Sequence, residues 1–246
     1  MKQYLKQDEW CIIEEGFHRE FNKISESVFS IGNGRMGQRA NFEEKFTGKT
    51  LQGSYVAGVY YPDKTRVGWW KNGYPEYFAK VLNAANWIGI DISLEGQELD
   101  LNKCEVENFT RLLNMKEGYL ERSFDAKMED GHQIKVNAKR FCSIVDDQVG
   151  VIRYAIRSIN FQGKITVFPY IDADVLNEDS NYDEKFWNEI FKEATEGQAI
   201  VTVETKKTGF HVTTGMRYDL VLNGKKVPPS AETLEKEKYA GNTVSL

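Results

Sequence analysis

The glycines of residues 31–39 raise the question of a phosphate site. Gly32, Gly34 and Gly37 stand in the order Gly-x-Gly-x-x-Gly, a pattern with which a strand-to-helix turn binds a dinucleotide. That function requires a parallel βαβ unit and an acidic residue about 20 positions further on, and both are missing here. Residues 39–44 (Arg-Ala-Asn-Phe-Glu-Glu) read as a loop. We therefore expect a tight turn at Asn33-Gly34 within a structured loop whose glycines admit a ligand close to the backbone.

Aromatic side chains gather in residues 60–78, among Gly, Pro and Asn. Aromatic faces beside Asp, Asn and Arg suit sugar recognition, because a pyranose offers an apolar C–H face and a ring of hydroxyls. The same rings could instead anchor a long loop to the body of the protein. The composition leaves both interpretations open.

Paired carboxylates occur at Glu14/Glu15, Glu43/Glu44, Asp146/Asp147 and Asp172 with Asp174. A glycosidase needs two carboxyl groups about 5 to 9.5 Å apart, but adjacent residues of a strand point to opposite faces. Asp172 and Asp174 could share a face, although solvated turn residues are the favoured interpretation. The three histidines have neither metal spacing nor a Ser or Cys motif beside them. The residues by themselves therefore establish no catalysis.

Composition excludes several classes of protein. The chain has 246 residues, 41% hydrophobic and 28% charged, as in an ordinary folded domain. Lys+Arg 32 against Asp+Glu 37 gives a net charge of −5 without a basic cluster, which argues against nucleic-acid binding. Three scattered cysteines form neither a disulfide framework nor a metal motif and are expected to be small buried thiols. The polar N-terminus and the lack of a long apolar run predict no signal peptide, no membrane span and a cytoplasmic location.

Alternation with a period of two dominates from Trp87 onward. Residues 88–94 alternate apolar with polar side chains, and Glu95-Gly96-Gln97 then turns the chain toward Leu99 and Leu101. Further strands are expected at residues 119–128, 132–143, 149–156, 165–171, 199–204, 210–214 and 218–222, with hairpin turns at Asp130-Gly131 and Asn223-Gly224. Residues 149–156 are apolar on both faces, which predicts a central strand. Many short strands with such turns favour a sandwich or barrel in one continuous domain.

Two helices are predicted outside this pattern. Residues 75–83 begin with Pro and have apolar residues at helical spacing, and residues 183–194 place Phe186, Trp187, Ile190, Phe191 and Ala194 on one stripe. Both should be short and lie against the sheets. Residues 241–246 alternate again, as either a short edge strand or a point at which a larger protein has been cut.

Several ordered motifs resemble the N-terminal domain of glycoside hydrolase family 65. They are residues 32–44, 53–61, 111–122, 139–143 and 171–177, and residues 67–79 are similar to the maltose-phosphorylase-like branch of that family. The likeness covers nearly the whole chain. It implies a mainly all-β fold, a large antiparallel β-sandwich of the galactose-mutarotase-like super-sandwich type with short peripheral helices.

The resemblance also implies that catalysis takes place in another part of the full-length protein. Residues 1–246 would be the N-terminal β-sandwich domain of a larger enzyme, whose catalytic α/α barrel is absent from this chain. In the family, phosphate attacks an α-linked disaccharide directly and gives an inverted β-sugar phosphate plus glucose, without a metal or an organic cofactor. No catalytic residue can then be placed in this chain. The barrel and a second copy in a homodimer are the implied partners.

By resemblance, residues 33–44 and residues 69–77 are candidates for the mouth of the active site. The candidate residues are Asn33, Arg35, Arg39, Glu43, Trp69, Trp70, Tyr74 and Tyr77. Three alternatives remain: a free-standing carbohydrate-binding module, a purely structural or dimerising domain, and a domain of a family 65 hydrolase. The sequence selects neither the disaccharide nor phosphorolysis over hydrolysis.

Overall fold

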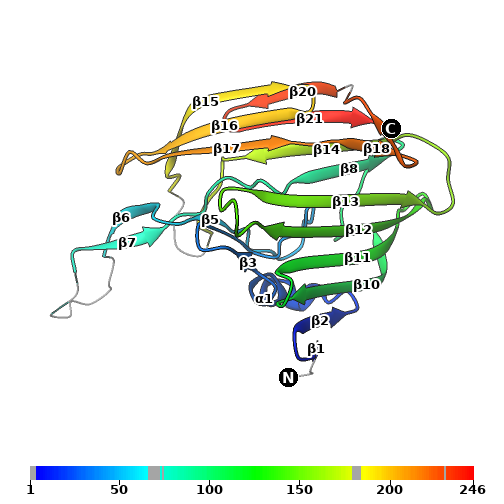
Figure 1. Ribbon diagram of the computed structural model, residues 1–246, viewed down its shortest axis with the longest axis horizontal. Coiled ribbons are helices and arrows are strands. Elements are labelled where there is room, and N and C mark those ends of the chain that lie inside the picture. Colours follow the sequence, from blue (N-terminus) through cyan, green and yellow to red (C-terminus); the bar gives the residue numbers. More distant parts are fainter. Residues whose placement is uncertain (1–3, 66–72, 74, 179–183, 230) are drawn as a thin grey trace.

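A six-stranded antiparallel sheet forms the largest layer of the protein (Figure 1). The structure is a computed structural model and describes residues 4–65, 73, 75–178, 184–229 and 231–246. In spatial order, the strands of this sheet are β1 (Leu5–Gln7), β2 (Cys11–Glu15), β10 (Glu105–Asn114), β11 (Tyr119–Lys127), β12 (Gln133–Cys142) and β13 (Gly150–Ser158). The hairpin expected at Asp130-Gly131 is confirmed, with Gly131 at φ +90°.

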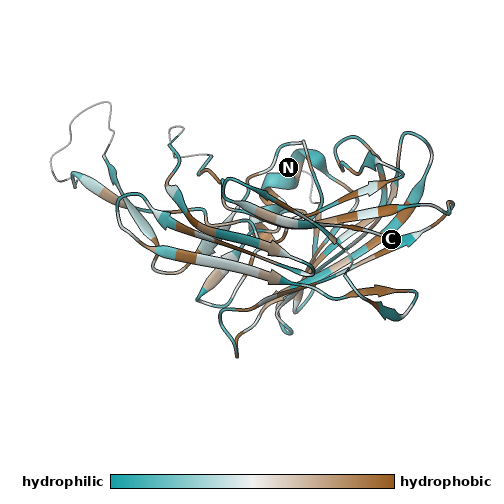
Figure 2. Cartoon of the chain, turned by 90° about the horizontal axis from the view of Figure 1, so that it is seen from above, coloured by the Kyte–Doolittle hydropathy of each residue, from teal (hydrophilic) through white to brown (hydrophobic). Residues whose placement is uncertain are grey.

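Two further sheets complete the body of the domain. A five-stranded sheet runs in the order β20 (Ala231–Lys236), β21 (Tyr239–Ser245), β14 (Ile165–Asp172), β8 (Ile90–Leu94) and β9 (Gln97–Glu98). A three-stranded sheet consists of β15 (Trp187–Thr195), β16 (Gln198–Thr205) and β17 (His211–Arg217). Figure 2 shows hydrophobic and hydrophilic residues alternating along these strands, the pattern of strands with one buried face.

Smaller elements lie around the three sheets. They are β3 (Ile31–Gly32), β4 (Met36–Gln38) and β5 (Ser54–Val56), the ribbon of β6 (Tyr60–Lys64) and β7 (Tyr77–Val81), the hairpin of β18 (Leu220–Leu222) and β19 (Lys225–Val227), the 3₁₀ turn η1 (Arg19–Phe21) and helix α1 (Asn22–Val28). The predicted turn at Asn223-Gly224 joins β18 to β19. Helix α1 was not predicted from the sequence.

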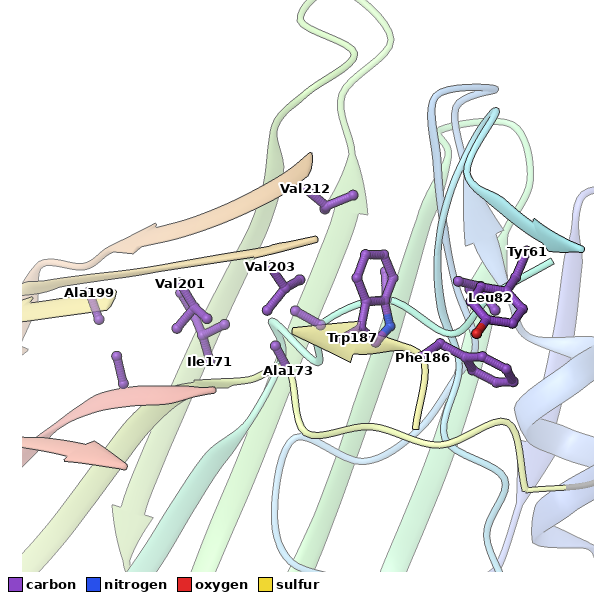
Figure 3. Packing of buried hydrophobic residues seen from close by; sticks show 13 residues of the cluster. Tyr61, Leu82, Ile171, Ala173, Phe186, Trp187, Ala199, Val201, Val203 and Val212 are labelled. Carbon is purple, nitrogen blue, oxygen red and sulfur yellow. The ribbon is translucent and has the colours of Figure 1, made fainter. Parts of the chain in front are cut away.

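The five-stranded sheet packs against both of the other sheets. Ile92 of β8 belongs to one core with Phe124 of β11 and Val136 of β12, from the six-stranded sheet. Ile171 of β14 belongs to another core with Val201 of β16, from the three-stranded sheet. Figure 3 shows this second core. The all-β sandwich expected from the sequence is therefore confirmed.

Both predicted helices are wrong, because the described residues in each range form a strand. Within 75–83 the chain forms β7, which pairs with β6 and leaves the helical-looking Phe78 and Val81 exposed. Within 183–194 it forms β15, whose register with β16 shifts between Glu189 and Phe191. Such a bulge breaks the alternation of period two. The apolar residues on either side of it then imitate a helical stripe.

Two strand positions also differ from expectation. β13 was predicted to be central but lies at the edge of its sheet and, among the described strands, pairs only with β12. β21, expected as an edge strand if it was a strand at all, lies inside its sheet between β14 and β20. The turn expected at Glu95-Gly96-Gln97 is present, with Glu95 and Gly96 at positive φ, and leads into the short strand β9.

Candidate functional site

The glycine-rich segment is a tight hairpin between β3 and β4. The side-chain oxygen of Asn33 accepts hydrogen bonds from the backbone N–H groups of Arg35 (3.0 Å) and Met36 (2.9 Å). Gly34 has φ +87°, a conformation that a residue with a Cβ rarely adopts. β4 then pairs with β5, so no helix follows and no dinucleotide fold is present here. The tight turn expected at Asn33-Gly34 is confirmed.

Asn33 also joins this hairpin to a distant loop. Its side-chain amide donates hydrogen bonds to the backbone carbonyls of Ser143 (2.5 Å) and Asp147 (3.0 Å), which lie in the turn between β12 and β13. Because Asn33 uses both its acceptor and its donor, it fixes the two turns relative to each other. Arg35 follows at the tip of the hairpin and is exposed.

An open cavity of about 420 Å³ lies beside Arg35. Aromatic walls come from Tyr55 of β5 and from Trp87, and polar groups come from Asp147 and His211. Its volume is within the range of small-molecule sites, about 300–1,000 Å³. Aromatic rings with a few polar groups are the chemistry that binds sugars, and the cavity brings Arg35 and the loop held by Asn33 to one place.

A second cavity of about 400 Å³ is also lined by β4 and β5. Arg35 and Tyr55 line both cavities, and Tyr60, Ala79 and Val81 of the β6–β7 ribbon complete the second. Tyr60 packs edge-on against Phe210 at 5.3 Å, which joins the base of the ribbon to the turn before β17. The aromatic segment is thus anchored at this end.

The remaining candidates of the aromatic segment divide into two groups. Tyr77 lies on β7, directly opposite Lys64, with 52% of its surface exposed. Trp69, Trp70 and Tyr74 lie outside the described residues.

Arg39 and Glu43 use their charged groups in the interior. Arg39 donates hydrogen bonds to the carbonyls of Leu51 (2.9 Å) and Lys23 (3.0 Å). Glu43, only 3% exposed, accepts hydrogen bonds from Arg122 (2.5 Å) and Arg140 (2.8 Å). The structure therefore separates these two residues from the cavities that Arg35 lines.

Glu43 belongs to a buried ionic cluster on the inner face of the six-stranded sheet. Arg122 donates from one nitrogen to Glu43 and to Glu44, each at 2.5 Å, and Tyr154 donates to Glu44. The ring of Phe42 lies 4.9 Å from the Arg122 guanidinium carbon and 5.0 Å from that of Arg111. The cluster thus anchors residues 41–44, part of the expected loop 39–44, to the neighbouring strands β11, β12 and β13.

This cluster does not supply a general acid. Burial alone would raise the pKa of Glu43, but Arg140 and Arg122 outweigh it and hold that pKa below its usual value. A glycosidase acid needs a raised pKa and access to substrate. The Glu43/Glu44 pair therefore holds the fold together, and the carboxyl group of Asp174 likewise binds Lys185 and Lys238.

Sequence reasoning missed the three arginines of the cluster. Arg111, Arg122 and Arg140 stand on the neighbouring strands β10, β11 and β12 at positions where the alternation calls for apolar residues. A charged residue inside an apolar alternation can be detected in the sequence. Its ionic partner cannot, because Glu43 lies 79 positions away from Arg122 in the chain.

A second polar group lies on the five-stranded sheet and was also missed. Burial, followed by repulsion from Glu98, raises the pKa of Asp91 to about 6. Burial also raises the pKa of Asp172 and of Tyr170, whose ring stacks on Tyr239 at 5.1 Å. The sheet thus holds carboxyl groups that bind protons more readily than a free aspartate does.

Neither a metal centre nor a membrane helix is found in the part of the chain that the structure describes. No group of three or more His, Cys, Asp or Glu residues there is placed to hold an ion. No helix there combines the length and the apolarity needed to span a membrane. The three thiols are free; Cys104 and Cys142 are buried as expected, whereas Cys11 is only half-buried.

Comparison with known proteins identifies the family. Residues 12–246 match the family described as Glycosyl hydrolase family 65, N-terminal domain. The chain belongs to this family. The family 65 domain is 44% identical to the maltose phosphorylase of Bacillus subtilis (strain 168) over 203 residues, 82% of this chain and 27% of that protein. It is 31% identical to the kojibiose phosphorylase of Thermoanaerobacter brockii over 173 residues, 70% of this chain and 21% of that protein.

A solved structure shares the fold of the family 65 domain. A human-microbiome protein assigned as a kojibiose phosphorylase superposes with a TM-score of 0.85 at 27% identity, covering 99% of this chain and 31% of that protein. The family 65 domain thus spans about a quarter of the length of the curated relatives it matches.

Proposed function

We propose that this chain is the non-catalytic N-terminal domain of a disaccharide phosphorylase. The observation that supports this most is the family match over residues 12–246, combined with a chain that spans 27% of the maltose phosphorylase. The neutralised Glu43/Glu44 pair agrees with a domain that leaves the chemistry to another part of the protein.

In the proposed enzyme, a barrel of helical hairpins carries the chemistry. Inorganic phosphate attacks the anomeric carbon of an α-linked disaccharide, the glycosidic bond breaks, and a β-sugar phosphate and glucose leave. The enzyme requires no metal or organic cofactor, acts in the cytoplasm and forms a homodimer. The end of the domain that carries Asn33, Arg35 and Tyr77 shapes the mouth of the active site, and Trp69, Trp70 and Tyr74 are further candidates for this role by resemblance.

Phosphorolysis assays on two proteins test this proposal. The full-length protein should release a β-sugar phosphate from maltose, trehalose or kojibiose with phosphate, whereas the 246-residue chain should release none. Water in place of phosphate distinguishes a hydrolase from a phosphorylase. Turnover by the 246-residue chain alone would show that the domain is catalytic, and no turnover of any α-disaccharide by the full-length protein would refute the enzyme class.

The cavity beside Arg35 favours one other function, a free-standing carbohydrate-binding module. Its aromatic walls at Tyr55 and Trp87 suit a sugar ring. Titration calorimetry of the 246-residue chain with maltose, trehalose and glucose separates the two functions. Saturable heat that Trp87→Ala abolishes would support the module, and the absence of heat with every sugar would exclude it.

A further inference from the structure

Strand β13 lies at an open edge of the six-stranded sheet. Among the described strands it pairs only with β12, although it is nine residues long. One face of the strand is apolar, and the other carries Arg153 and Arg157. Val151 on one face is 39% exposed, and Ile152, Tyr154 and Ile156 on the other are only half-buried. The half-buried apolar face therefore leaves surface that a further strand beside β13 would cover. An uncovered edge of this kind is a template for pairing with another strand.

The backbone of β13 offers its hydrogen bonds toward that open side. The N–H of Ile159 donates to the carbonyl of Gln133 on the β12 side, in register with the β12–β13 ladder. Because bonding alternates along an antiparallel pair, odd-numbered residues of β13 bond β12. Ile152, Tyr154 and Ile156 therefore direct their N–H and C=O groups away from the sheet.

Strand β17 presents a second edge of the same kind. In the part of the chain that the structure describes, β17 pairs only with β16, and the N–H of Tyr218 donates to the carbonyl of Gly197 in register with that ladder. Even-numbered residues of β17 therefore bond β16. Thr213 and Gly215 direct their backbone groups to the opposite side.

The two edges border one slot in the same layer. Gly150 at the start of β13 and His211–Gly215 of β17 line the same cavity. β14 runs beneath both, because Ile165 packs into the core that contains Tyr154, and Ile171 packs against Val201. Figure 1 shows β13 and β17 running in the same direction, so one strand between them would be antiparallel to both.

The floor of this β13–β17 slot is incompletely covered. Val167 and Pro169 share a face of β14 with Ile165 and Ile171 because side chains alternate along a strand. β14 has hydrogen-bonded neighbours on both sides, yet Val167 and Pro169 remain half-buried and belong to neither hydrophobic core. A covering strand would join the two cores into one.

We infer that the β13–β17 slot receives one antiparallel strand from the part of the full-length protein that lies outside this sequence. The inference rests on the proposed function, in which the full-length protein is longer. The curated relatives have several times the length of this chain, and Leu246 bonds Ile165 at the start of β14, beside the core that β13 also enters. The incoming strand should be apolar at alternate positions, over Val167 and Pro169, and polar on the outer face beside Thr213.

Amide hydrogen exchange in the 246-residue chain and in the full-length protein tests this inference. The outward amides of Ile152, Tyr154, Ile156, Thr213 and Gly215 should exchange fast in the short chain and about tenfold or more slowly in the full-length protein. The amides of Val212 and Thr214, already bonded to β16, are internal controls and should be protected in both proteins.

A pair of variants separates backbone pairing from side-chain effects. Thr213→Pro removes one outward N–H, and the matched control Thr213→Val keeps that N–H while losing the same hydroxyl contact with Thr202. In the full-length protein, Thr213→Pro should lower the protection of the β13 amides at least about threefold relative to Thr213→Val.

Two outcomes would overturn the inference. One is equal exchange of the five outward amides in both proteins. The other is protection that rises with concentration in the 246-residue chain alone, because the occupant is then a second copy of this chain. A full-length protein without phosphorylase activity that still protects these amides would refute the proposed function and leave the slot assignment intact.

Discussion

Asn33 donates a hydrogen bond of 2.5 Å to the backbone carbonyl of Ser143, 110 residues further along the chain. The same side chain closes its own hairpin by accepting from Arg35 and Met36. One residue therefore determines both the turn and its position beside the β12–β13 loop. Removing only the donor should separate these two roles.

Asn33→Asp keeps the acceptor of the turn and replaces the donor by a second oxygen. That oxygen faces the carbonyls of Ser143 and Asp147, so two acceptors lose their partner and repel the new charge. We expect the free energy of unfolding to fall by about 1–3 kcal/mol in urea titrations. Amide exchange in residues 143–149 should rise while that of Arg35 and Met36 changes little. Unchanged exchange in residues 143–149 would contradict the assignment.

Substitution of Arg122 should strongly destabilise the fold, because this side chain donates hydrogen bonds to two buried carboxylates. Arg122→Met leaves Glu43 and Glu44 without one shared donor in a site that excludes water. We expect a loss of about 3–5 kcal/mol in the free energy of unfolding, measured by urea denaturation. Arg153→Met, at an exposed position of β13, is the control and should stay within about 0.5 kcal/mol of the parent chain.

A double variant checks the cause of that loss. Adding Glu44→Gln to Arg122→Met removes the uncompensated charge and leaves Glu43 paired with Arg140, so the double variant should be more stable than Arg122→Met. If the double variant is the less stable of the two, packing by the Arg122 side chain outweighs its charge.

Local sequence patterns are sufficient to predict a strand that pairs with the next strand along the chain. The alternation of β11 and β12 and the Asp130-Gly131 turn form one hairpin, so no distant residue is needed to define it. The bulge in β15 depends on pairing with β16 and is invisible in its own residues. The edge position of β13 depends on which strands lie beside it, which the apolar pattern does not encode.

The candidate site was predictable in a similar, partial way. The Asn-Gly turn placed Arg35 at an exposed tip. In the sequence, Arg39 and Glu43 look as available for binding as Arg35 does. In the structure, contacts with Arg122, Arg140 and Leu51 hold their charged groups in the interior. Such long-range partners cannot be read from spacing.

Gly150 should resist enlargement, because the ring of Trp87 lies across it. A Cβ on Gly150 would stand 2.3 Å from an atom of that ring. Gly150→Ala should therefore cost about 1–3 kcal/mol of stability, measured by urea denaturation, through displacement of the indole. Gly37→Ala is the control, since its Cβ would meet no atom within 4 Å. Trp87→Leu combined with Gly150→Ala should recover part of the loss, and an additive double variant would exclude the contact.

Arg35 should affect substrate binding in the full-length enzyme without affecting the fold. It is exposed and lines both cavities, whereas Arg39 bonds backbone carbonyls in the interior. We expect Arg35→Ala to raise KM for the disaccharide about tenfold with kcat nearly unchanged. Arg39→Ala should instead lower the free energy of unfolding. A KM within about twofold of the parent value for Arg35→Ala would remove Arg35 from the proposed mouth.

Asp91 should make stability depend on pH with a defined sign. Burial, then Glu98, raises its pKa from 3.8 to about 6, so the folded state keeps a proton that the unfolded state releases. Stability from this group is therefore lost as the pH rises from about 4 to 6, and the penalty is complete above that window. Asp91→Asn should raise the free energy of unfolding by about 1–2 kcal/mol at pH 7.5, after allowance for partial exposure, and by little at pH 4. Asp219→Asn is the control, because the hydrogen bond from Lys226 lowers the pKa of Asp219 and the substitution should bring no gain at pH 7.5. Urea titrations at both pH values measure the difference, and an equal gain from Asp91→Asn at pH 4 and pH 7.5 would show that ionisation of Asp91 is not its cause.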